Sequence, residues 1–283
     1  MDRRNIIAAM PAIGFLGSRP RGLPVGGQGL VLGQSLVIEE IGVQLYTLRS
    51  LLSEDVDGTL ALVAEIGYRT VEFAGLYGFT PREMRGKLDA AGLRAVSSHA
   101  GVNEIRGDWP FFLEGAQELG QDLVFVPSIP ESERTPEGLR HLAEDFNRAG
   151  EMARSAGLRF GYHNHDWEFA ALSDGTIMMD VLLECTERRL VDWQMDIFWT
   201  VHGGGDPMVY LEREAGRVTS VHLKDRTSDG LMVDVGKGVI DFATILPRAE
   251  ELGMLHAFVE HDTPDAPLES VRYSFNALSA LEL

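Results

Sequence analysis

The residues best suited to chemistry lie in the stretch 160–169, which reads FGYHNHDWEF. His163 and His165 are two positions apart, so on a β-strand both imidazoles would point to the same face. Asp166 and Glu168 follow at once, and imidazoles with carboxylates are the groups that bind divalent metals or act as acid and base. A histidine pair can also be structural, hydrogen-bonded inside a core. The stretch predicts a functional site only if other reactive residues join it.

The length, charge and cysteine content of the chain limit the classes of protein to which it can belong. The chain has 283 residues, of which 45% are hydrophobic and 24% charged, as expected for one large globular domain or two modest ones. Its net charge of −18 would repel phosphate backbones and anionic membrane surfaces, so we expect no nucleic acid partner. Cys185 is the only cysteine, which excludes an internal disulfide. The sequence leaves the oligomeric state open.

The N-terminal residues 1–35 differ in character from the rest. Arg3 and Arg4 precede a small-residue apolar run over 6–17, which resembles a twin-arginine export signal and predicts a periplasmic or exported protein. Two more arginines directly after the run and the lack of a clear cleavage site count against export without overturning it. The alternative is a disordered extension of a cytoplasmic protein. No run approaches the roughly 20 apolar residues of a membrane span, so none is expected.

From residue 41 onward the chain repeats one unit eight times: a short apolar run, a polar loop and an amphipathic stretch. The expected strands are 42–47, 70–73, 93–99, 123–127, 158–163, 191–196, 218–223 and 256–260. The expected helices lie near 56–66, from 80 onward, and near 109–119, 135–156, 176–186, 207–214, 242–252 and 268–281. Alternating strands and helices predict parallel strands joined by right-handed crossovers, and eight units predict a closed (β/α)8 TIM barrel as one catalytic domain over 41–283. An open doubly wound sheet is the alternative, but no Gly-x-Gly-x-x-Gly follows the first strand.

In such a barrel the active site lies at the C-terminal ends of the strands. Six of the eight expected strands carry an ionisable residue at or just beyond that end: Glu72, His99, His163, His165, Asp196, His222, Lys224, Glu260 and His261. Each of these residues alone has an ordinary structural interpretation. Their shared position at one rim favours a functional site.

Four consecutive strands supply a candidate metal-binding set, namely His163, Asp196, His222 and Glu260. Mixed nitrogen and oxygen ligands suit one divalent ion such as Mn, Fe, Co, Zn or Mg, and the sequence does not select among them. Glu168 lies five residues past His163 and could bend back as a ligand or as a base. The sequence does not decide which of these two residues is the strand-five ligand.

Several motifs carry a resemblance to a known superfamily. They are GVQLYTLR at 42–49, VEFAG at 71–75, YHNHDWEF at 162–169, MDIFW at 195–199, VHLKD at 221–225 and FVEH at 258–261. With these motifs the chain resembles the sugar phosphate isomerase/epimerase superfamily, the xylose isomerase-like TIM barrels. The resemblance implies one divalent metal held by Glu, Asp, His and Glu on strands five to eight, and Asp196, His222 and Glu260 match three of these. Strand five departs from the pattern by offering His163, and this Tyr-His-x-His variant is similar to inosose dehydratase-like members, which favours a lyase.

The chemistry that this resemblance implies is enolisation of a sugar, keto-sugar or cyclitol by an isomerase, epimerase or lyase. The metal would polarise a carbonyl, with Glu260 or Glu168 as base and His165, His99 or Lys224 as the proton donor. Glu72 is a further candidate catalytic residue. The aromatic residues Tyr46, Phe73, Trp167 and Trp199 are candidates for the substrate-binding walls.

The remaining alternatives concern substrate and class. The segment 236–238, Gly-Lys-Gly, lies after strand seven, where barrels often bind phosphate, but neighbouring aspartates favour an unphosphorylated substrate. A non-catalytic sugar-binding barrel is one competing interpretation. An endonuclease IV-like nuclease is another, which the acidic charge disfavours.

Overall fold

Eight parallel strands close into a barrel in the computed structural model, which describes residues 40–281. Around the barrel the strand order is β1, β10, β7, β6, β5, β4, β3, β2. The strands are β1 (Gly42–Gln44), β2 (Thr70–Phe73), β3 (Arg94–His99), β4 (Leu123–Val126), β5 (Arg159–His163), β6 (Asp192–Asp196), β7 (Val218–Leu223) and β10 (His256–Val259). Neighbouring strands are parallel at every pairing, so the predicted TIM barrel is confirmed.

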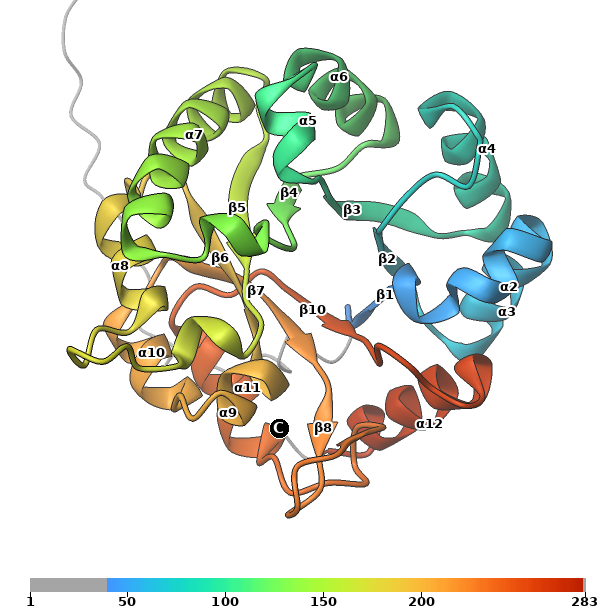
Figure 1. The fold of residues 1–283 in the computed structure, drawn as a ribbon. Helices are drawn as coiled ribbons and strands as arrows, with labels where there is room; N and C mark the ends of the chain where they lie inside the picture. The colour runs from blue at the N-terminus through green and yellow to red at the C-terminus, as the bar shows by residue number, and fades with distance from the viewer. Residues whose placement is uncertain (1–39, 282–283) are drawn as a thin grey trace, which may run out of the picture. The chain divides into compact units, whose positions relative to one another are not determined.

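Helices surround this barrel, as Figure 1 shows. They are α2 (Arg49–Glu54), α3 (Val56–Ile66), α4 (Pro81–Ala91), α5 (Val102–Arg106), α6 (Trp109–Leu119), α7 (Pro136–Ser155), α8 (Met178–Cys185), α9 (Ile197–His202), α10 (Pro207–Arg213), α11 (Phe242–Glu251) and α12 (Pro267–Ser279). Short 3₁₀ turns are η1 (Leu45–Leu48), η2 (Glu131–Glu133) and η3 (Trp167–Phe169). The predicted N-terminal extension or signal over 1–35 lies outside the described residues.

Local sequence explains where α4 begins and ends. The Thr80 side chain accepts a hydrogen bond from the Glu83 backbone N–H, and the Glu83 carboxylate accepts one from the Thr80 backbone, as the sequence predicts for a capping box. Pro81 occupies the first turn, where its missing N–H costs nothing. Gly92 then ends the helix with φ 71°, a left-handed conformation that glycine adopts without strain.

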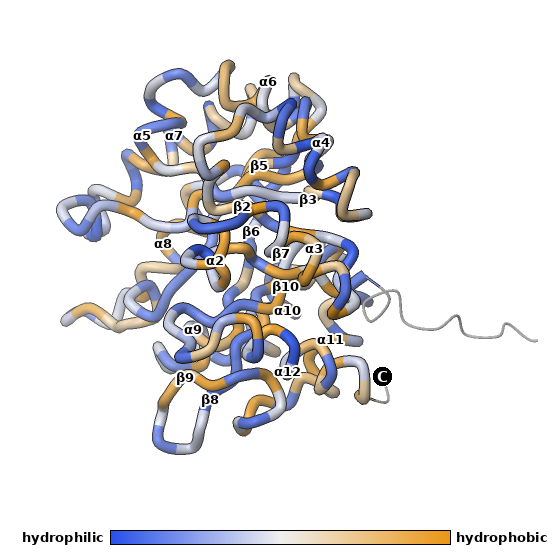
Figure 2. The backbone as a smooth tube through the Cα atoms, turned by 90° about the vertical axis from the view of Figure 1, so that its right-hand side faces the viewer, coloured by the Kyte–Doolittle hydropathy of each residue, from blue (hydrophilic) through white to orange (hydrophobic). Residues whose placement is uncertain are grey.

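The strands lie among buried apolar side chains, and Figure 2 shows hydrophobic stretches along the central strands. Inside the barrel, however, one group of fully buried side chains is polar. Its members are Gln44, Glu72, Ser97, Gln194 and Ser220. Buried polar groups must be hydrogen-bonded, so this group forms a connected network that the site rests on.

A β-hairpin that the sequence did not indicate follows the seventh barrel strand. It consists of β8 (Asp225–Arg226) and β9 (Met232–Val233), paired antiparallel outside the barrel. The buried Asp225 carboxylate accepts hydrogen bonds from the backbone N–H groups of Gly236, Gly238 and Ile240 at 2.9 to 3.1 Å. One side chain thus holds the loop after the hairpin against the end of β7.

Among residues 40–281, no helix is both long enough and apolar enough to cross a membrane.

Candidate metal centre and active site

His222 stands between two carboxylates at the C-terminal end of the barrel. Its Nδ1 lies 2.7 Å from Glu260 Oε2, and its Nε2 lies 2.6 Å from Glu72 Oε1. The parallel register pairs His222 with Asp196 of β6 on one side and with Phe258 of β10 on the other. The carboxylates of Glu72, Asp196 and Glu260 around this ring are almost fully buried, so the His222 ring is held in one position.

Lys224, two residues further along the chain, lies against three carboxylates. Its Nζ is 2.9 Å from Asp196 Oδ2, 2.7 Å from Glu260 Oε2 and 2.6 Å from Asp262 Oδ1. The side chain is 1% exposed, so these carboxylates replace the water that would otherwise solvate the ammonium group. Burial alone would lower the pKa of Lys224, but Asp196, Glu260 and Asp262 outweigh it and raise the pKa well above its usual value.

The centre is rich in negative charge. Burial raises the pKa of Asp196 to about 6 despite the opposing effect of Lys224. Burial would lower the pKa of His222, yet the carboxylates of Glu260 and Glu72 raise it to about 10. With Asp262 counted, four carboxylates share one lysine and one protonated imidazole, which leaves an excess of two negative charges that a divalent cation would neutralise.

Two further imidazoles adjoin His222. The centroid of the His163 ring lies 4.5 Å from that of His222, and the centroid of His99 lies 5.6 Å from it. His99 Nε2 and His163 Nδ1 both approach the Gln194 side-chain oxygen, at 2.8 and 3.0 Å. His163 Nε2 faces Asp196 Oδ2 at 3.8 Å, a separation that a shared metal ion could bridge.

These donors fit a divalent metal ion. Asp196, His222 and Glu260 offer ligand atoms that all lie within 4.8 Å of one another, and the same holds for the group His99, His163 and His222. Asp196 Oδ2 is buried without a hydrogen-bond donor, although the Lys224 ammonium group lies near it. This oxygen is paired with Lys224 by charge but receives no hydrogen bond, so it can still act as a metal ligand. The four residues predicted as ligands therefore lie at one place.

A cavity of about 580 Å³ opens above this centre. Of the predicted residues, Tyr46, His99, His163, His165, Lys224 and Glu260 line it. Glu104, Phe112 and Asp262 line it too, although they were not predicted from the sequence. For Asp262 a signal existed, since it lies two positions after Glu260 and an extended chain would place both side chains on one face. Glu104 and Phe112 come from helices α5 and α6, whose contribution the strand-end pattern could not indicate.

Glu168 is directed away from this cavity. Tyr162 Oη donates a short hydrogen bond to Glu168 Oε1, and the His165 backbone N–H donates to Oε2 at 3.0 Å. The side chain is 1% exposed, and burial raises its pKa to about 7 against the opposing hydrogen bonds of Tyr162 and His165. In this arrangement the carboxylate holds the loop that carries His165.

The aromatic residues named from the sequence lie in different surroundings. Tyr46 lines the cavity, with the Arg49 guanidinium carbon 4.0 Å from its ring centroid. Phe73 is 1% exposed and belongs to the hydrophobic core. Trp167 packs under Arg134, and Trp199 lies 5.8 Å from the His165 ring with its buried Nε1 unpartnered.

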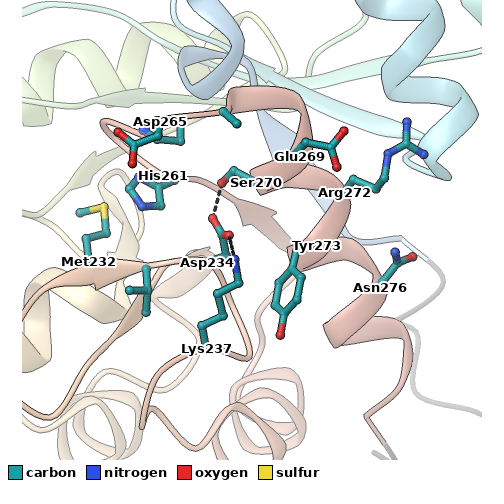
Figure 3. Close-up of a pocket in the computed structure, with 13 residues that line it drawn as sticks. Met232, Asp234, Lys237, His261, Asp265, Glu269, Ser270, Arg272, Tyr273 and Asn276 are labelled. Atoms are coloured by element: carbon teal, nitrogen blue, oxygen red, sulfur yellow. Dashed lines mark hydrogen bonds and ion pairs between the residues drawn. The ribbon is translucent and has the colours of Figure 1, made fainter.

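A second pocket, of about 560 Å³, lies between the hairpin and α12, and Figure 3 shows its lining. Asp234 accepts hydrogen bonds there from Ser270 and Lys237, and Tyr273 and Arg272 project from α12. None of the residues predicted to be catalytic or to bind metal lines this pocket. We place the candidate active site in the first cavity, where those residues meet.

Comparison with known proteins bears on the family of this chain. The sequence pattern of the family described as Xylose isomerase-like TIM barrel matches residues 60–280. An inosose dehydratase of Geobacillus kaustophilus is 28% identical over 215 residues, which cover 68% of each chain. The solved structure of a sugar phosphate isomerase/epimerase from Parabacteroides distasonis superposes with a TM-score of 0.76 and 27% identity, covering 89% of this chain and 97% of the other. A structure of the IolI protein with a bound zinc atom shares the fold at 15% identity, with a TM-score of 0.66, and covers 84% of this chain and 96% of its own.

Proposed function

Because this chain belongs to the xylose isomerase-like TIM barrel family, we propose that it is a divalent-metal-dependent enzyme that enolises an unphosphorylated keto-sugar or cyclitol and eliminates water from it. The observation that carries the proposal is the meeting of Asp196, His222 and Glu260 donor atoms beside the Lys224 ammonium group at the floor of one cavity. The inosose dehydratase relative and the zinc atom of the IolI structure agree with this class of reaction and cofactor.

In the proposed mechanism His163, Asp196, His222 and Glu260 hold the metal. When bound, the metal supplies Lewis acidity that lowers the pKa of the proton next to a substrate carbonyl. The Glu260 carboxylate borders the cavity and takes that proton. Lys224 donates a proton to the hydroxyl that departs from the neighbouring carbon, so one C–H and one C–O bond break and water leaves.

The short distance between Glu260 and Lys224 allows both groups to return to their starting protonation states. After elimination Glu260 carries a proton and Lys224 has lost one, and their atoms are 2.7 Å apart. One proton transfer along this hydrogen bond restores both groups. The geometry favours elimination over epimerisation, because epimerisation needs a second base on the opposite face and Glu168 is bonded to Tyr162 and the His165 backbone instead.

The same cavity suggests how a polyhydroxylated substrate is held. The imidazoles of His99 and His165 and the carboxylates of Glu104 and Asp262 line it and can hydrogen-bond substrate hydroxyls, and Tyr46 offers a ring for a sugar face. The backbone N–H groups of Gly236 and Gly238, which a phosphate would need, already donate to Asp225. This favours an unphosphorylated substrate.

The test is incubation with inosose and a panel of unphosphorylated keto-sugars in heavy water, with Mn²⁺ or Zn²⁺, followed by NMR. We expect deuterium next to the carbonyl and a dehydrated product. Lys224→Met should slow elimination by about 100-fold or more, the size of a lost acid catalyst. Lys237→Met, which removes a lysine outside the cavity, should not change the rate.

The outcomes separate the alternatives. Deuterium exchange with isomerised sugar and no dehydrated product would replace elimination by isomerisation. A protein that binds substrate without exchange at any metal concentration would be a sugar-binding barrel, and would contradict the proposal.

A further inference from the structure

Glu72 lies below the cavity, fully buried, and is absent from its lining. Its Oε1 accepts from Gln44 Nε2 at 2.7 Å and lies 2.6 Å from His222 Nε2. Its Oε2 accepts from Ser97 Oγ at 2.6 Å and from Gln194 Nε2 at 2.8 Å. His99 Nε2 also lies 3.2 Å from Oε1, so donor groups surround both oxygens of this carboxylate.

Because Gln44, Ser97 and His222 direct their hydrogens at this carboxylate, it acts as an acceptor, and this fixes the orientation of the Gln194 amide. The amide nitrogen must face Glu72, so the amide oxygen faces the two imidazoles. His99 Nε2 and His163 Nδ1, at 2.8 and 3.0 Å from that oxygen, must then both carry hydrogen. The lone pair of His163 is left on Nε2, the nitrogen that faces Asp196.

The same reasoning applies directly to His222. Its Nε2 lies 2.6 Å from Glu72 and its Nδ1 lies 2.7 Å from Glu260, so without a metal each nitrogen faces a carboxylate and carries hydrogen. A metal ion would replace the hydrogen on Nδ1, beside Glu260, while Glu72 keeps the hydrogen on Nε2. Metal-binding histidines commonly donate their other ring N–H to a carboxylate, which selects the ligating nitrogen. Here one carboxylate reaches two candidate ligands, one directly and one through an amide.

We infer that Glu72 is a positioning residue that fixes which ring nitrogens of His222 and, through Gln194, of His163 carry hydrogen. Its consequence for metal affinity rests on the proposed function, whereas the hydrogen positions themselves do not. In the other tautomer His163 would present an N–H to Asp196 and could not bind a metal through Nε2.

The variant Glu72→Gln tests this with no change of shape. If its amide oxygen stays with Gln44 and His222, its amide nitrogen meets the Gln194 nitrogen, and Gln194 must turn over. Its nitrogen would then donate to His163 Nδ1 and move the hydrogen of His163 to Nε2. The ¹⁵N spectrum of histidine-labelled, metal-free protein reports this exchange of protonated nitrogens.

The double variant Glu72→Gln/Gln194→Glu is compared with the single variant Glu72→Gln. Its new glutamate accepts from the new glutamine and from His163 Nδ1, so the original tautomer should return with the total charge unchanged. Ser97→Ala is the matched control, since it removes one hydrogen bond to Glu72 without touching a histidine. Zn²⁺ affinity should fall 10- to 100-fold in Glu72→Gln, recover in the double variant and change little in Ser97→Ala.

An unchanged His163 spectrum in Glu72→Gln would overturn the inference, as would equal losses of Zn²⁺ affinity in the single and double variants. If the wild type binds no Zn²⁺ but the spectra change as described, the positioning role stands and the proposed metal function fails.

Discussion

Glu168 and the histidines of the strand-five motif have different surroundings although they lie within six residues of one another. His163 and His165 line the cavity, whereas the Glu168 carboxylate is enclosed beside Tyr162. Burial lowers the pKa of His165 to about 4, with a further contribution from Lys224, and raises that of Glu168 to about 7. The same cause thus keeps an imidazole neutral and makes a carboxylate costly to ionise.

The raised pKa of Glu168 predicts a pH-dependent stability. In the unfolded chain the Glu168 carboxyl loses its proton near pH 4.5, and in the folded protein it does so near pH 7. The free energy of unfolding therefore falls as pH rises from about 4.5 to about 7, and this group has no further effect above pH 7. The full effect is on the order of 3 kcal/mol, at about 1.4 kcal/mol per pKa unit. Glu168→Gln should therefore gain stability relative to the wild type as pH rises from 5 to 8, measured by urea unfolding.

Glu54→Gln, at an exposed position, is the control and should give a difference that does not vary with pH. A difference between wild type and Glu168→Gln that is constant from pH 5 to 8 would show that burial does not raise this pKa.

At the scale of elements, the predicted strands and helices are confirmed, and the differences occur at strand ends, where β1 stops at Gln44 and the turn η1 takes up Leu45–Leu48. The helix expected near 109–119 is α6, Trp109–Leu119. Helix α9 was not expected. It begins directly after β6 because the Asp196 side chain accepts a hydrogen bond from the Trp199 backbone N–H. The residue predicted as a metal ligand is also a helix cap, and hydrophobic periodicity cannot indicate so short a helix.

The hairpin after β7 provides a second prediction. Asp225→Asn replaces one accepting oxygen by an amide nitrogen that faces backbone N–H groups, so donors at Gly236, Gly238 or Ile240 lose their partner. We expect a loss of about 2 kcal/mol in unfolding free energy, because a hydrogen bond to a charged acceptor contributes roughly 1.5 to 3 kcal/mol. Hydrogen exchange at Gly236 and Gly238 should become faster than in the wild type.

Asp229→Asn at the exposed tip of the same hairpin is the control, since the Asp229 carboxylate accepts from the neighbouring Thr227 side chain and is not bonded to Gly236 or Gly238 in the described residues. Unchanged exchange at Gly236 and Gly238 in Asp225→Asn would mean that the loop is held by other contacts.

At the scale of the whole molecule, the barrel brings the buried carboxylates of Asp196 and Glu260 together at the C-terminal ends of its strands. A metal ion bound there links four strands, so its removal should destabilise the entire barrel. At 100 times its Kd a ligand that binds only the folded state stabilises it by about 2.7 kcal/mol. For a domain of this size that corresponds to roughly 5 to 10 °C in Tm.

We therefore expect Mn²⁺ or Zn²⁺ to raise the Tm of chelator-treated protein, as measured by calorimetry, and His222→Ala to abolish the rise. An equal rise in His222→Ala would place the binding on the acidic surface of this chain, whose net charge is −18.

The sequence by itself determined the barrel and the rim. Eight apolar runs alternating with amphipathic stretches permit few other arrangements, and period two along a strand fixes which residues share a face. His163, Asp196, His222 and Glu260 could be brought to one place on these grounds alone, because the C-terminal ends of parallel strands meet.

Only the tertiary structure decided what each reactive side chain touches. Glu72 lies below the rim and Glu168 beside Tyr162, because the strand register and the irregular turn η3 set those directions. Gln194 shares a face with Asp196 in the sequence, but its link between Glu72 and two imidazoles spans strands far apart in the chain. Spacing within a strand is a local property, whereas the partners of a buried polar group depend on how the barrel closes.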